Sequence, residues 1–169
     1  MIIKIIRFFF QPHVFGLSIA LFCMASLSAA LMAQYGYDLK PCILCMYQRY
    51  PFALNAVLGL IIYKLAKKNH PRGASLMLVM AGIVFLANSA LAFYHVGVEQ
   101  LWWESVLEAC TFDPSKLRDA MYEPPVPCNQ IPWQDPILGM SMAGWNVVVC
   151  GIAGICTMIC ARYGKVIVT

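Results

Sequence analysis

Four long apolar stretches, each almost free of charged residues, divide this chain of 169 residues. They cover about residues 14–34, 43–63, 74–97 and 141–161, and each has the ~20 residues that a helix needs to cross ~30 Å of hydrocarbon. Lipid offers the backbone no hydrogen-bonding partner, so such segments are expected to be helical. The pattern predicts a single-domain, all-α integral membrane protein built as a four-transmembrane-helix bundle.

The composition agrees with this pattern. Apolar residues make up 61% of the chain and charged residues only 12%, which does not describe a soluble globular protein. The net charge is +4, but no basic patch with interleaved aromatic residues indicates a nucleic-acid partner.

The charged residues between the apolar stretches are sorted by sign. Basic residues without acidic neighbours occur before the first stretch, in the 64–73 connection and after the last stretch: Lys4, Arg7, Lys64, Lys67, Lys68, Arg72, Arg162 and Lys165. All 8 acidic residues lie in the short 35–42 connection and the long 98–140 connection. The positive-inside rule therefore predicts cytoplasmic termini, a cytoplasmic 64–73 loop, and two loops on the outer side.

A cleaved signal peptide is the alternative interpretation of residues 1–30, which combine a basic start, an apolar core and small residues. The core of about 20 residues is longer than the ~7–15 of a signal peptide. Cleavage would also leave an odd number of spans and place the basic loop on the wrong side. We therefore interpret the first stretch as a retained span.

The second stretch begins with a pair of cysteines, in the run Pro41-Cys42-Ile43-Leu44-Cys45-Met46-Tyr47-Gln48-Arg49. On a helix, Cys42, Cys45 and Arg49 share one face. The positive end of the helix dipole and the Arg49 cation would both favour a thiolate. Because the preceding loop is short, the pair is expected at the outer membrane surface, cycling between dithiol and disulfide.

Arg49 lies about 10 Å along this helix, where a guanidinium is costly without a partner. It can snorkel to the interface or donate to a carbonyl of a lipid-soluble redox cofactor, and the shared face with the cysteines favours the second role. A quinone fits, because its carbonyl oxygens accept hydrogen bonds and its ring accepts two electrons. Gln48 and Tyr47 are weaker candidates for this role and are interpreted first as packing or interface residues.

His95 lies at the end of the third stretch, with Glu99 one helical turn further on the same face. It is expected at the outer interface, level with Cys42 and Cys45. It is either a polar helix end or, because histidine titrates near neutral pH, a quinone ligand or proton carrier.

Cys110 and Cys128 lie in the long outer loop, where an oxidising environment favours a disulfide between them. The bond is either a structural staple or a partner for thiol exchange, and the redox pair on the same side favours exchange. Zinc binding by the four outer cysteines is the other possibility. The second pair lacks zinc-finger spacing and Arg49 would repel a cation, so no metal is expected.

Other features are assigned no chemistry. A short helix is predicted from Asp113-Pro114 to about residue 121, and residues 131–140 are expected in the membrane interface. The remaining cysteines are interpreted as apolar packing residues within or below the spans: Cys23, Cys150, Cys156 and Cys160.

Together these features resemble the DsbB family of bacterial inner-membrane disulfide-bond oxidoreductases. The resemblance covers nearly the whole chain. It is carried by the run 41–49, His95, the pair Cys110 and Cys128, and the run Leu138-Gly-Met-Ser-Met-Ala-Gly-Trp-Asn146.

This resemblance implies that the chain reoxidises a periplasmic DsbA-like oxidase and passes the electrons to ubiquinone or menaquinone. A thiolate of the partner would attack Cys110 and release Cys128. Cys128 would then engage Cys42 and leave Cys45 as a thiolate against the quinone. Arg49 and His95 would lie at the quinone. The loop between Cys110 and Cys128 follows no pattern of the family, so a general and a specialised partner both remain open.

Two other classes are considered. An enzyme similar to vitamin K epoxide reductase also places a CxxC pair beside a quinone in a four-helix bundle, but its loop cysteines precede that pair, whereas here they follow it. A membrane scaffold with two structural disulfides would leave Arg49 without a purpose.

Overall fold

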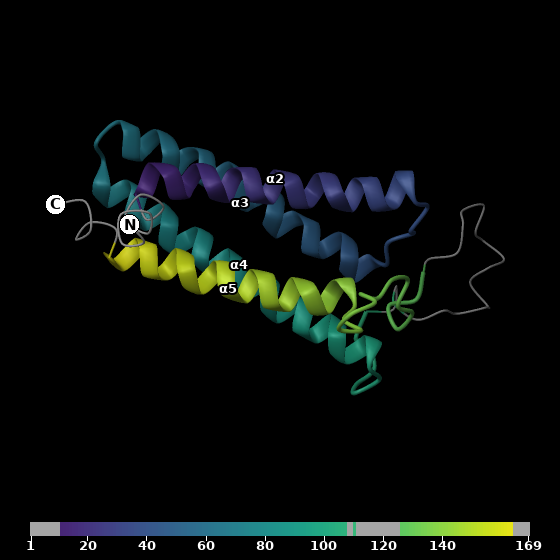
Figure 1. Cartoon of the computed structure of the whole chain (residues 1–169). Helices are drawn as coiled ribbons and strands as arrows, with labels where there is room; N and C mark the ends of the chain where they lie inside the picture. Colours follow the sequence, from purple (N-terminus) through teal and green to yellow (C-terminus); the bar gives the residue numbers. More distant parts are fainter. Residues whose placement is uncertain (1–10, 108–109, 111–125, 164–169) are drawn as a thin grey trace.

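Four long helices make up the computed structural model, which describes residues 11–107, 110 and 126–163. They are α2 (Pro12–Gly36), α3 (Ile43–Lys67), α4 (Pro71–Glu99) and α5 (Met142–Tyr163). The helices run alongside one another in an elongated bundle (Figure 1), and the described residues contain no regular strand. The predicted all-α bundle is confirmed.

The turn between α3 and α4 is shorter than the 64–73 connection expected from the sequence. Only residues 68–70 separate the two helices, and Asn69 adopts a left-handed backbone conformation there. The helices extend further because Lys64 and Lys67 interact favourably with the C-terminal end of α3 and Pro71 begins α4. The short helix expected at 113–121 lies outside the described residues.

The outward faces of the bundle are those of a multi-pass membrane protein. The helices α2, α4 and α5 are long and apolar enough to cross a membrane, and α3 matches α2 in length and packs between α2 and α4. Large apolar side chains such as Leu21, Ile83 and Ile152 are exposed, whereas Asn55 and Asn88 are buried. Apolar residues outside and polar residues inside suit lipid as the surrounding solvent.

Glycine allows α2 and α3 to approach closely. A Cβ atom on Gly59 would lie 2.7 Å from the backbone nitrogen of Ala20 and 2.7 Å from the carbonyl oxygen of Gly16. Small residues at such a crossing let two helix backbones touch within a membrane. The contact joins α2 and α3 near the start of α2 and the end of α3, toward the α3–α4 turn.

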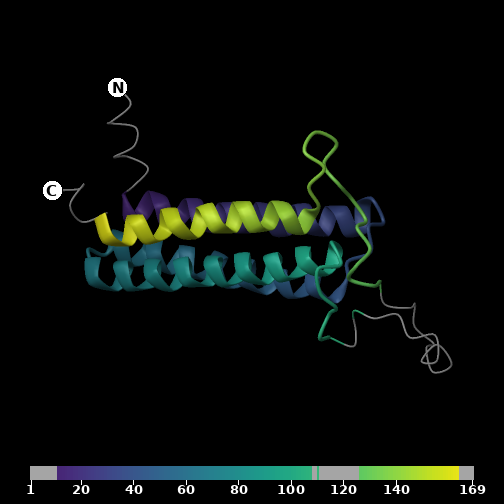
Figure 2. The ribbon, with the colours of Figure 1, turned by 90° about the horizontal axis from the view of Figure 1, so that it is seen from below.

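The bundle is open on one side. The helix α3 packs against α2 and α4, and α4 packs against α5, but α2 and α5 scarcely touch. The start of α2, the end of α5 and the α3–α4 turn lie at one end of the bundle (Figure 2). The 37–42 connection and the described parts of the 100–141 connection lie at the other end.

Candidate functional site

Cys42 is the residue that caps the N-terminus of α3. Its sulfur accepts a hydrogen bond from the backbone amide of Cys45 at 3.3 Å, in the manner of a side-chain N-cap. The two sulfurs lie 3.0 Å apart. The helix start therefore brings the two thiols together and supplies a backbone donor to one of them.

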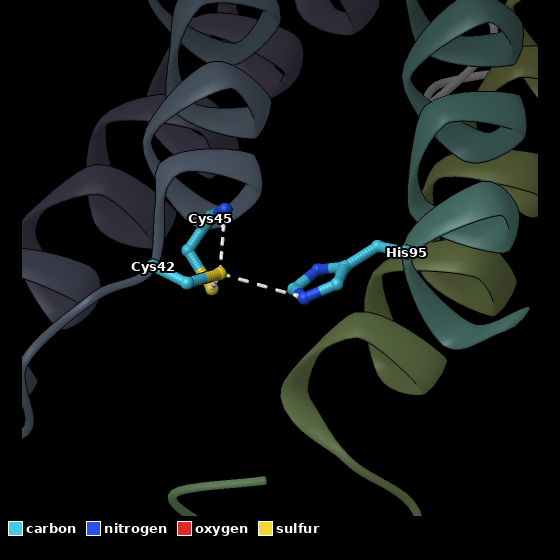
Figure 3. Close-up of side chains that lie close together, drawn as sticks. All are labelled: Cys42, Cys45 and His95. Carbon is cyan, nitrogen blue, oxygen red and sulfur yellow. Dashed lines mark hydrogen bonds between the residues drawn. The ribbon is translucent and has the colours of Figure 1, made fainter. Parts of the chain in front are cut away.

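His95 reaches the cysteine pair from α4. Its Nε2 atom lies 3.4 Å from the sulfur of Cys42, and Figure 3 shows the ring pointing at this sulfur from the neighbouring helix. The same nitrogen lies 3.7 Å from a carboxylate oxygen of Glu99. The expectation that His95 lies level with the cysteines is confirmed.

The surroundings of Cys42 stabilise its thiolate. The hydrogen bond with the Cys45 thiol lowers the pKa of Cys42 most, burial opposes this, and the hydrogen bond with His95 lowers it further. The pKa of Cys42 therefore lies well below that of a free thiol. The sequence attributed this effect to the helix dipole and to Arg49. Arg49 is not among these causes, and its guanidinium donates to Gln34 Oε1 at 2.6 Å.

Cys110 and Cys128 form the disulfide predicted from the sequence. Both cysteines are buried in one cluster with Cys42, Leu44 and Val98. The loop disulfide thus packs on the N-terminal end of α3, on the side of Cys42. This proximity suits thiol–disulfide exchange, which requires a thiolate to reach a disulfide sulfur.

A mostly apolar cavity of about 460 Å³ lies between α2, α3 and α5. Its lining includes Cys45, Gln48 and Arg49 from α3, with Trp133 and Trp145 opposite. Cavities of this size and character bind small organic molecules and cofactors. Neither Cys42 nor His95 is part of this lining, so the two cysteines differ in what they face.

Several polar residues have more hydrogen-bond partners than their sequence positions predict. Gln48, interpreted as a packing or interface residue, is buried and contacts His95 Nδ1 at 3.0 Å. Asn146 donates to Gln48 at 2.6 Å, and Ser141 donates to Glu99 at 2.5 Å. An amide within an apolar span is a signal that could have identified Gln48 and Asn146, since such residues need partners.

Cys42, Cys45 and His95 are also the described residues that could hold a metal ion. Their ligand atoms all lie within 4.8 Å of one another. Two thiolates and an imidazole form a donor set for a soft or borderline cation such as zinc. The expectation that no metal takes part stays a prediction.

Comparisons with known proteins place these features in one family. The family model described as "Disulfide bond formation protein DsbB" matches residues 12–160. Two similar relatives are "Disulfide bond formation protein B" of Azoarcus sp. (strain BH72), 29% identical over 82% of this chain and 86% of its own length, and that of Shewanella frigidimarina (strain NCIMB 400), 31% identical over 75% and 76%. No solved structure matches the chain.

Proposed function

The chain belongs to the DsbB family of disulfide bond formation proteins, and we propose that it reoxidises a DsbA-like thiol oxidase with a membrane quinone as electron acceptor. The partner would be a thioredoxin-fold oxidase of the periplasm, and the acceptor ubiquinone or menaquinone. The protein would thereby sustain the formation of disulfide bonds outside the cytoplasm.

One observation carries this proposal: of the two cysteines of α3, only Cys45 also lines the cavity. Both cysteines pack with the cluster that contains the loop disulfide, and Cys45 in addition lines the cavity between α2, α3 and α5. A dithiol placed in this way can exchange with the loop on one side and meet a small oxidant on the other. A purely structural disulfide would not need the second contact.

The exchange steps follow from thiol chemistry. A thiolate of the partner attacks the Cys110 sulfur, and Cys128 leaves as a thiolate; the second thiol of the partner then attacks the mixed disulfide and releases Cys110. Cys128 next attacks Cys42 in an oxidised Cys42–Cys45 pair, and Cys45 leaves as a thiolate. Attack of Cys110 on Cys128 restores the loop disulfide and releases Cys42. Two electrons have then moved from the partner to Cys42 and Cys45.

The cavity fits a quinone ring. It is largely apolar, and the Arg49 guanidinium and the Gln48 amide on its wall can donate to carbonyl oxygens. A bound quinone supplies an acceptor for two electrons and two protons. Cys45 is the thiol that contacts this space, and Arg49 would orient the ring and hold negative charge near Cys45.

His95 takes a different part in this proposal from Arg49. Its ring contacts the Cys42 sulfur and is not among the residues that line the cavity. We therefore assign to His95 the stabilisation of the Cys42 thiolate, which is the leaving group when the loop disulfide is restored. The sequence suggested that His95 could bind the quinone. Because His95 does not line the cavity, it could act on a quinone there only through its contact with Gln48.

The charge distribution supports an orientation in the inner membrane. Lys64, Lys67 and Arg72 lie near the α3–α4 turn, and Arg162 lies at the end of α5, at the same end of the bundle. The positive-inside rule assigns this end to the cytoplasm. The cysteines at the opposite end would then lie in the periplasm, which reporter fusions at the α3–α4 turn and in the 98–140 loop would test.

The proposal is tested with purified protein, a reduced DsbA-like oxidase and soluble analogues of ubiquinone and menaquinone. We expect one quinone reduced for each partner disulfide formed, and a visible charge-transfer absorbance on adding quinone that is lost in Cys45→Ser. Cys42→Ser should oxidise about one equivalent of partner from its loop disulfide and then stop. Cys156→Ser, a cysteine of α5 outside the relay, serves as the control. Full quinone reduction by Cys45→Ser would contradict the proposal.

A further inference from the structure

A continuous row of hydrogen-bonded polar side chains leads from His95 into the interior of the bundle. The polar row consists of His95, Gln48 on α3, Asn146 and Cys150 on α5, and Asn88 on α4. All except Asn146 are buried, with at most 7% of the side chain exposed. The electron relay proposed above uses neither Asn146, Cys150 nor Asn88.

Each hydrogen bond of the polar row has a direction. The Asn88 amide donates to the Cys150 sulfur at 3.4 Å, and the Cys150 thiol donates to Asn146 Oδ1 at 2.9 Å. The Asn146 amide nitrogen then donates to Gln48 Oε1 at 2.6 Å. This leaves the amide nitrogen of Gln48 facing His95 Nδ1 at 3.0 Å.

This last contact determines which ring nitrogen of His95 carries the proton. An amide nitrogen can only donate a hydrogen bond, so Nδ1 must accept one. A neutral imidazole has one donor and one acceptor. The proton therefore lies on Nε2, the atom that faces the Cys42 sulfur at 3.4 Å and Glu99 at 3.7 Å.

The groups around Nε2 favour the same arrangement. One oxygen of Glu99 accepts from Ser141 at 2.5 Å, while the other faces the ring. The Cys45 sulfur lies 3.0 Å from the Cys42 sulfur. An unprotonated Nε2 would direct its lone pair at a thiolate and a carboxylate. Reversing the polar row would also require Gln48, Asn146 and Cys150 to turn together, because each bond sets the next.

We propose that the polar row holds His95 in the tautomer protonated on Nε2, so that this proton stays directed at the Cys42 sulfur. Gln48, Asn146 and Cys150 are then positioning residues that act through His95. The consequence for turnover rests on the proposed function, whereas the tautomer itself does not. A donor that is already oriented when Cys42 leaves as a thiolate needs no reorganisation at that step.

The tautomer can be measured directly by ¹⁵N NMR of histidine-labelled protein in lipid nanodiscs. His13→Gln and His70→Gln remove the other two of the 3 histidines. We expect a protonated Nε2 and an unprotonated Nδ1 for His95. Gln48→Glu should move the proton to Nδ1, because a carboxylate only accepts hydrogen bonds. A wild-type ring protonated on Nδ1 would overturn the proposal.

Substitutions far from the ring test the row itself. Asn146→Leu and Cys150→Ala should produce a mixture of tautomers, and the thiolate population of Cys42 should fall by roughly tenfold near the midpoint of its titration, the effect of losing one oriented donor to a charged group. The matched control is Asn55→Leu, a fully buried amide of α3 outside the row, which should leave the tautomer unchanged. An unchanged tautomer in Asn146→Leu would overturn the proposal.

A second readout separates this inference from the proposed function. The thiolate population is followed by its ultraviolet absorbance, with the Cys42→Ser protein subtracted, and needs no quinone or partner. A wild-type protein that does not turn over with quinone would contradict the proposed function. The tautomer measurement would still decide the inference on its own.

Discussion

The sulfur of Cys42 lies 3.4 Å from Nε2 of His95, although 53 positions separate the two residues in the chain. The contact joins the start of α3 to the last turns of α4. It places a nearly fully buried histidine, 2% exposed, where it can donate to a thiolate. Burying an unpaired imidazole inside an apolar bundle would cost free energy, and the contact with the Cys42 sulfur offsets this cost.

The contact predicts that His95→Gln raises the pKa of the Cys42 thiol toward its ordinary range. Less thiolate would then be present near neutral pH, and quinone-dependent turnover there should fall roughly tenfold. The loss of turnover should become smaller as the pH is raised, because Cys42 then ionises without the hydrogen bond from His95. Titration of the thiolate absorbance measures the change. His70→Gln, exposed at the opposite end of the bundle, is the control, and an unshifted His95→Gln titration would contradict the assignment.

The lowered pKa of Cys42 also predicts how stability depends on pH. A group whose pKa is lowered by folding stabilises the folded state above its unfolded pKa, and this contribution is lost as the pH falls toward the folded pKa. The melting temperature of the reduced protein should therefore rise, relative to that of Cys42→Ser, between about pH 5 and about pH 8. Protein with an oxidised Cys42–Cys45 pair should show no such rise. If the melting temperatures of the reduced wild type and of reduced Cys42→Ser change with pH by the same amount, folding does not stabilise the Cys42 thiolate.

The hydrogen bond from Arg49 to Gln34 predicts a graded effect on quinone binding. Arg49→Ala should raise the KM for the quinone analogue by roughly tenfold or more, since it removes a charged donor from the cavity wall. Gln34→Leu should have a smaller effect, because the guanidinium stays but loses its anchor. Arg72→Ala, at the other end of the bundle, should leave the KM unchanged. Equal KM values in wild type and Arg49→Ala would show that the cavity is not the quinone site.

The close approach of α2 and α3 predicts that even a methyl group is excluded there. Gly59→Ala would place a Cβ atom 2.7 Å from backbone atoms of α2, and it should destabilise the protein by about 1–3 kcal/mol. The thermal unfolding midpoint in detergent should fall by several degrees. Gly73→Ala is the matched control, because its Cβ would meet only Leu65, at 3.4 Å. If Gly59→Ala were as stable as the wild type, α2 and α3 would have to lie further apart than the 2.7 Å contacts imply.

Much of the molecule follows from local sequence. The apolar stretches predict the helices, because a backbone in lipid must satisfy its own hydrogen bonds. Cys42 and Cys45 flank a helix start, and Cys110 pairs with Cys128, as their spacing and context indicate. These features depend on residues near one another in the chain or on a single loop closure.

Other features are decided only by tertiary structure. Three features depend on which helix faces meet: the open side between α2 and α5, the contact of Cys45 but not Cys42 with the cavity, and the anchoring of Arg49 by Gln34. Gln48 and Asn146 are 98 positions apart, and nothing local to either predicts the bond between them. Helical periodicity tells which residues share a face, but the crossing of glycine-containing helices determines which faces are buried together, and with them the partners of each polar side chain.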